Sequence, residues 1–203
     1  MKLTLQILIF TVLPVLVLVF GLVPLNLRGF VLALVVLGAV GLAIYEKMPL
    51  KELGFRTDNL KRSLIPYGVF TLVSALGLIG LANLLGIQPI ANWWTNSHLQ
   101  WAFLPISAAQ EFGYRAYFQT KLQKKINPYL AIFIMATLYS GMHILWRNPL
   151  IMAMTFVGGI AWGYLWYKYP NFYLLTISHS ILNFLAIFLG FCPWLVTAFF
   201  NLS

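Results

Sequence analysis

The chain consists of long apolar runs separated by short polar loops. Each run approaches the roughly 20 consecutive apolar residues that an α-helix needs to cross the hydrocarbon core of a bilayer. In chain order, the runs occupy residues 3–23, 29–45, 63–85, 100–120, 128–146, 149–167 and 172–190. This pattern predicts seven membrane-spanning helices. Pro128 should lie in the first turn of its helix, where its missing N–H costs nothing.

A shorter apolar tail, residues 191–202, follows the seventh run and contains Pro193. Its length fits either a short eighth span or a re-entrant piece. The longest polar segment covers residues 46–62, which is too short to fold alone. We therefore expect an all-α fold: a multi-pass transmembrane bundle of about eight helices, with residues 1–203 forming a single integral membrane domain.

The composition supports a membrane environment. Hydrophobic residues make up 61% of the chain and charged residues 8%, whereas soluble domains carry about 25% charged residues. Lipid must cover the apolar surface that a fold of this length cannot bury. The formal net charge of +9 arises because acidic residues are scarce, and we expect no nucleic-acid partner. The single cysteine, Cys192, excludes an internal disulfide and a Cys-rich metal site.

The basic residues gather in alternate loops. One set contains Lys2, Lys47, Lys51, Arg56, Lys61, Arg62, Lys121, Lys124, Lys125 and Lys168, and the other contains Arg28 and Arg147. Cytoplasmic loops of membrane proteins carry the excess of Lys and Arg. We therefore expect a multi-pass protein, in a bacterial plasma membrane, with its N-terminus in the cytoplasm.

Three of the apolar runs carry polar residues in pairs four positions apart. The pairs are Glu111 with Arg115, Tyr139 with His143, and His179 with Asn183, and Gln110 stands beside the first pair. A spacing of four places both members on one helix face. Polar side chains are costly in hydrocarbon and mark functional sites there by default. We expect the three faces to surround one cavity, and Arg115 to pair with Glu111.

The depths of these residues can be compared at a rise of about 1.5 Å per residue. Glu111 and His179 lie about 13 Å and 10 Å from the cytoplasmic ends of their runs. His143 lies about 22 Å along from Pro128, so it reaches the same level only if the first turns of its helix project below the bilayer.

Each pair also has a purely structural explanation. Glu111 and Arg115 can form a buried salt bridge, and His179 and Asn183 can link neighbouring helices by hydrogen bonds. Two intramembrane histidines near the intramembrane carboxylate favour instead a metal ion or an activated water. Gly159 and Gly163 form a small-xxx-small pair, which we interpret as a site of close helix packing.

These residues resemble the CAAX-protease and bacteriocin-processing family, also called the CPBP or Abi family, which includes the Ras-converting CAAX endopeptidase. The family signature is Glu-Glu-x-x-x-Arg, then Phe-x-x-x-His, then His-x-x-x-Asn. Here the motifs read Gln110-Glu111-Phe112-Gly113-Tyr114-Arg115, Tyr139-Ser140-Gly141-Met142-His143 and His179-Ser180-Ile181-Leu182-Asn183. With the preceding Leu53-Gly54-Phe55-Arg56, the family-like core covers residues 49–183.

Two positions depart from the signature. Tyr139 replaces Phe, which is a minor change, but Gln110 replaces the first Glu. The resemblance assigns that position, with His143, to activation of the attacking water. An amide cannot take up a proton, so activity depends on whether Glu111 can act as the base instead.

The resemblance implies hydrolysis of a peptide bond within or beside the bilayer. Glu111 and His143 would polarise a water or hold a metal, His179 and Asn183 would donate to the oxyanion, and Arg115 would orient Glu111. If zinc is bound, its three protein ligands would be Glu111, His143 and His179. The implied substrate is a membrane-associated peptide or protein, such as a prenylated CAAX-type chain.

A second function stays open. Because Gln110 lacks a basic carboxylate, the chain can be a non-catalytic family member, a scaffold or regulator that binds a partner transmembrane helix. A small transporter is disfavoured, since the sequence lacks inverted repeats and matched broken helices. In each case membrane lipid is a partner.

Overall fold

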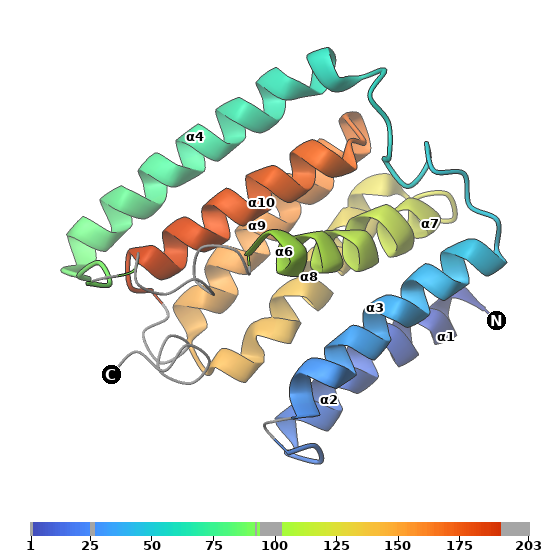
Figure 1. Cartoon of the computed structure of the whole chain (residues 1–203), viewed down its shortest axis with the longest axis horizontal. Helices are drawn as coiled ribbons and strands as arrows, with labels where there is room; N and C mark the ends of the chain where they lie inside the picture. Colours follow the sequence, from blue (N-terminus) through green and yellow to red (C-terminus); the bar gives the residue numbers. More distant parts are fainter. Residues whose placement is uncertain (1, 25–26, 92, 94–102, 192–203) are drawn as a thin grey trace. The chain divides into compact units, whose positions relative to one another are not determined.

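The computed structural model describes residues 2–24, 27–91, 93 and 103–191. Within these ranges the chain forms helices joined by turns, with no β-strand (Figure 1). The predicted all-α fold class is confirmed. An apolar chain in lipid favours this outcome because each backbone N–H and C=O of a helix is satisfied within the helix itself.

The chain divides into two compact units, one containing residues 1–56 and 110–172 and the other residues 57–109 and 173–203. The helices of the first unit are α1 (Leu3–Ile7), η1 (Leu8–Val12), α2 (Leu13–Val19), α3 (Arg28–Tyr45), η4 (Phe112–Gln119), α7 (Thr120–Leu122), α8 (Pro128–Met142), η5 (His143–Trp146) and α9 (Pro149–Lys168). The second unit contains α4 (Leu60–Leu85), most of α6 (Phe103–Glu111) and nearly all of α10 (Phe172–Phe188).

These helices follow the seven predicted runs closely. Three of the described helices are long and apolar enough to cross a membrane, namely Leu60–Leu85, Pro128–Leu145 and Pro149–Lys168, and shorter apolar helices cover Leu3–Val19, Ala33–Tyr45 and Phe172–Phe188. The chain is thus an integral membrane protein. The number of spans and the single-domain organisation stay predictions, and the proposed C-terminal span lies, apart from Phe191, outside the described residues.

Asn-Pro pairs begin α8 and α9, two helices of the first unit. Asn127 Oδ1 accepts a hydrogen bond from the Tyr129 amide at 2.9 Å, and Pro128 occupies the first turn of α8 as predicted. Asn148 caps α9 in the same way ahead of Pro149. The asparagine satisfies amides that lack a partner in the helix, and the proline lacks the amide that would need one.

Helices α8 and α9 pack closely where α9 carries Gly159 and Gly163. A Cβ atom added to Gly159 would lie 3.1 Å from Ala136, and one added to Gly163 would lie 3.0 Å from Ile132. Larger side chains would therefore separate the two backbones. The interpretation of this glycine pair as a packing site is confirmed.

The segment Leu53-Gly54-Phe55-Arg56 docks against the end of α9. Gly54 has a φ of +78°, and a Cβ there would lie 2.3 Å from the Trp166 ring. The carbonyl of Gly54 accepts a hydrogen bond from the Phe172 amide at 2.9 Å, and the Phe55 and Phe172 rings lie 4.5 Å apart. Both the backbone conformation and the space require glycine at this position.

In the second unit, polar and aromatic contacts hold α4 and the residues that follow it against α10. Thr71 Oγ1 of α4 donates to Ser178 Oγ of α10 at 2.7 Å. The Ile90 amide, beyond the end of α4, donates to the Phe188 carbonyl at 2.8 Å. Trp93 packs edge-on against Phe184 and Phe188.

Candidate active site

The first motif lies where the winding of one helix changes. The α-helical turns of α6 end at Glu111, and η4 continues from Phe112 to Gln119 as a π-helix. Segments of π-helix are rare overall, and those that occur are often found at functional sites. Helix η4 contacts α3, α8 and α9. Its buried residues are Phe112, Tyr114, Arg115, Ala116, Tyr117, Phe118 and Gln119.

Glu111 and Arg115 form a completely buried ion pair. Arg115 Nη1 lies 3.4 Å from Glu111 Oε1, and both side chains are 0% exposed, which confirms the predicted pairing. At this distance the contact is a charge pair and not an aligned hydrogen bond. The guanidinium also donates from Nη2 to the Gly159 carbonyl at 3.4 Å and lies 4.4 Å from the centre of the Tyr139 ring.

The second motif places an aromatic side chain and an imidazole beside this pair. The Tyr139 ring lies 5.4 Å from the Tyr114 ring and 4.9 Å from the His143 ring. His143 Nδ1 lies 2.9 Å from the Tyr139 carbonyl oxygen. A carbonyl only accepts, so Nδ1 carries the proton and Nε2 of the neutral ring carries the lone pair. This is the tautomer that a base or a metal ligand needs.

The two motifs occupy matching levels of neighbouring helices. Helix α8 contacts η4 and runs back along it after the short turn at residues 123–127. Arg115 contacts Tyr139 across the two helices. Four residues further from the connecting turn, the first helix carries Glu111 and the second carries His143. The carboxylate and the imidazole therefore lie at the same level.

This pairing also bears on the depth of His143. Tyr139 lies eleven residues into α8, whereas Arg115 lies seven residues from the end of α7. Measured from the level of the Arg115–Tyr139 contact, α8 therefore extends further toward the connecting turn than α7 does. Such an offset is what the depth comparison requires of the first turns of α8.

Gln110 stands next to this arrangement. Its Oε1 atom is buried, with no hydrogen-bond partner among the described residues. A buried amide oxygen in that state is an acceptor suited to a water or a ligand. It can hold a water by hydrogen bonds, but it cannot remove a proton from it.

The third motif lies in the second unit. His179 is completely buried on α10. Asn183 Nδ2 donates to Ser107 Oγ at 3.3 Å, and Ser107 precedes Glu111 by four residues in the sequence. Gln110, Glu111, Arg115, Tyr139 and His143 thus belong to one unit and His179 and Asn183 to the other. The convergence of all three motifs on one cavity stays a prediction.

The predicted zinc site also draws on both units. Glu111 and His143 come from the first unit and His179 from the second. Across the described part of the chain, no group of three or more His, Cys, Asp and Glu side chains is arranged to hold a metal ion. The zinc site with these three ligands stays a prediction, and no step below runs through a metal.

The sequence did not reveal several side chains that shape this site. Gln119 Nε2 donates to the Gly163 carbonyl at 2.8 Å, four residues beyond the carbonyl that Arg115 contacts. Gln119 is a polar residue eight positions after Glu111 in an apolar run, so the same helical face could have drawn attention to it. Tyr114 gives no such signal, because an aromatic residue is ordinary in a span.

Part of the chain matches a known protein family. Residues 90–185 match the family described as type II CAAX prenyl endopeptidase Rce1-like. Comparisons with curated proteins and with solved structures gave no match. The matched region contains the three motifs that end at Arg115, His143 and Asn183, so residues 90–185 of this chain are similar to the Rce1-like family of CAAX proteases.

Proposed function

We propose that this protein is an intramembrane endopeptidase that cleaves a membrane-associated peptide or protein, of the prenylated CAAX class. One arrangement supports this most directly: the Glu111 carboxylate is completely buried, and the contact between Arg115 and Tyr139 places it at the level of His143. A carboxylate and an imidazole within a membrane helix pair are suited to removing a proton from water. The match of residues 90–185 to an endopeptidase family supports the same reaction.

In the proposed reaction, a water attacks the carbonyl carbon of the scissile peptide bond. Glu111 or His143 takes the proton of the water and passes it to the leaving nitrogen as the C–N bond breaks. His179 and Asn183 donate hydrogen bonds to the oxyanion, the interaction that stabilises the transition state most in acyl transfer. Arg115 keeps the Glu111 carboxylate in place through their ion pair.

A non-catalytic role is the second candidate, and one observation favours it. The buried amide of Gln110 occupies the position where the family signature has a carboxylate. In that case the same residues would bind a transmembrane helix of a partner protein without cleaving it.

Cleavage of farnesylated CAAX peptides by the purified protein in lipid nanodiscs distinguishes the two functions. We expect slow cleavage by the wild type. We expect Glu111→Gln and His143→Asn to lose at least about 10²-fold of that rate, because each removes a proton acceptor. Glu52→Gln serves as the control, since Glu52 is an exposed acid in a loop. Equal rates for folded wild type and Glu111→Gln would refute the endopeptidase function.

We also propose that the N-terminus and the lysine-rich turn after α7 face the cytoplasm, because the basic residues gather in alternate loops. In right-side-out membranes, a cysteine at Lys124→Cys should react with a membrane-impermeant thiol reagent only after the membrane is opened. A cysteine at Asn96→Cys, which lies outside the described residues, should react at once. Labelling should be measured in a Cys192→Ser background, and the reverse pattern would overturn this topology.

A further inference from the structure

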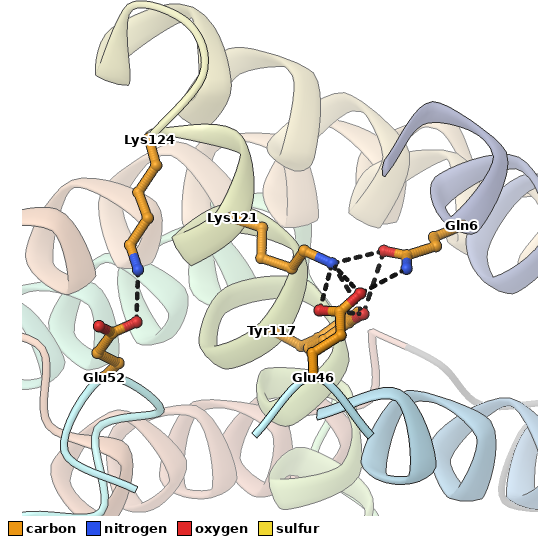
Figure 2. Close-up of polar contacts among 6 residues, drawn as sticks. All are labelled: Gln6, Glu46, Glu52, Tyr117, Lys121 and Lys124. Carbon is orange, nitrogen blue, oxygen red and sulfur yellow. Dashed lines mark hydrogen bonds and ion pairs between the residues drawn. The ribbon is translucent and has the colours of Figure 1, made fainter. Parts of the chain in front are cut away.

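A cluster of four polar residues includes two that lie two and six residues beyond the end of the first motif. Gln6 of α1, Glu46 directly after α3, Tyr117 of η4 and Lys121 of α7 point toward one another (Figure 2). Gln6 is 1% exposed and Tyr117 is 0% exposed, while Glu46 and Lys121 are partly buried. Nothing in the proposed reaction uses these residues.

The hydrogen bonds of the cluster satisfy Lys121 completely. Its Nζ lies 2.5 and 2.7 Å from the Glu46 carboxylate oxygens, 2.8 Å from Gln6 Oε1 and 3.1 Å from the Tyr117 hydroxyl. Three N–H donors thus meet three different side chains. Gln6 in turn donates from Nε2 to Glu46 at 2.8 Å.

Glu46 is held in its charged form within this cluster. Burial alone raises the pKa of its carboxyl, but the hydrogen bonds from Lys121, Gln6 and Tyr117 and the charge of Lys121 outweigh burial and bring the pKa below its usual value. A lowered pKa adds stability above the pKa of the unfolded chain, and this stability is lost as the pH falls through the folded pKa. The ion pair is therefore intact at neutral pH.

The π-helix η4 needs such contacts to keep its wide turns, because π-helical hydrogen bonding is rarely stable by itself. On one side, Arg115 and Gln119 donate to the carbonyls of Gly159 and Gly163 on α9. Tyr117 is two residues from each of them, which places it on roughly the opposite side of the helix. Its hydroxyl lies 3.1 Å from Gln6 Oε1 and 3.2 Å from Glu46 Oε2, and its single proton can be donated to either oxygen. Contacts with α9 on one side and contacts of Tyr117 on the other thus hold η4 in place.

We infer that the Gln6–Glu46–Tyr117–Lys121 cluster positions the first motif by holding η4 in its wide winding, so that Glu46 and Lys121 act on the reaction through the placement of Glu111 and Arg115. The functional part of this inference rests on the proposed endopeptidase activity. Its structural part does not, because the winding of residues 112–122 can be measured in a protein without activity.

The chain contains a matched control. Lys124, in the turn after α7, and Glu52, in the loop after α3, also form a hydrogen-bonded ion pair (Figure 2). This second pair is exposed, its side chains being 56% and 41% accessible, and it has no contact with η4 among those described. Exposed pairs contribute little to stability.

The experiment compares Glu46→Gln, Glu46→Asp and Glu52→Gln with the wild type, each as the full chain in nanodiscs. Backbone hydrogen exchange should accelerate about tenfold in residues 112–122 of Glu46→Gln, since a hydrogen bond to a charged group is lost. Exchange in α9 should stay as in the wild type. The kcat for peptide cleavage should fall roughly 10–100-fold, with KM within about twofold, because misplacing catalytic groups by about 1 Å has that effect.

Glu46→Asp should recover most of the exchange protection and of kcat, and Glu52→Gln should change neither. Equal effects of Glu46→Gln and Glu52→Gln would overturn the inference, as would unchanged exchange in residues 112–122. Accelerated exchange throughout the first unit would also overturn it, because the cluster would then stabilise the whole unit. If the wild type cleaves nothing, the proposed function fails, and the exchange data alone decide whether the cluster positions η4.

Discussion

Gln110→Glu should raise the rate of peptide cleavage by about 10²–10⁴-fold, the usual contribution of a general base. A base needs a lone pair that accepts a proton near neutral pH, and a primary amide has none. The Gln110 Oε1 atom is buried without a hydrogen-bond partner among the described residues, so a carboxylate of nearly the same shape can take its place. Single-turnover cleavage of a farnesylated peptide measures the change in the chemical step.

A matched variant distinguishes the effect of a new proton acceptor from the effect of a new negative charge. Gln123 Oε1 is likewise buried with no described hydrogen-bond partner, but it lies in the turn after α7. Gln123→Glu should therefore leave the rate within about twofold of wild type, because it places no proton acceptor beside the motif. An unchanged rate for folded Gln110→Glu would show that position 110 takes no part in proton transfer. Complete inactivity of wild type and Gln110→Glu alike would favour the non-catalytic role.

The positions of the helices followed from the sequence because hydrocarbon imposes one dominant constraint. A chain segment in lipid must satisfy its backbone internally and present apolar side chains, so runs such as 63–85 and 149–167 are readable as helices. Helices α4 and α9 occupy those runs to within a few residues. The Glu111–Arg115 pair was predictable for a related reason, since a spacing of four joins two side chains on one helix.

The winding of η4 was not predictable. A pair of residues four apart fits both an α-helix and a π-helix, and residues 112–119 contain no proline that would mark a change of winding. The winding depends on contacts with distant parts of the chain, such as the carbonyls of Gly159 and Gly163. Local sequence carries no information about those partners.

The polar cluster around Lys121 escaped prediction because its members come from separate segments. Gln6 is a lone polar residue in an apolar run, and Glu46 is the first residue of the polar segment 46–62. Only the packing of α1, α3 and η4 places them together. An isolated glutamine in a span was the available signal, because lipid offers its amide no partner.

Arg115→Leu should lower the free energy of unfolding by about 3–5 kcal/mol, the usual cost of leaving one member of a buried ion pair without its counter-charge. Arg115 and Glu111 are both completely buried, so water cannot replace the guanidinium. The variant also loses the hydrogen bond to Gly159 and the contact with the Tyr139 ring. Thermal or denaturant unfolding in a defined detergent measures the loss.

The double variant Glu111→Gln/Arg115→Leu identifies the cause of this loss. It should recover part of the stability, because no unpaired charge is left buried. Replacing both partners of a buried pair is often nearly neutral. Arg115→Lys should fall between wild type and Arg115→Leu, since it retains a charge but not the planar group over Tyr139. Unchanged stability of Arg115→Leu would contradict the ion pair and favour a guanidinium that reaches the lipid headgroups instead.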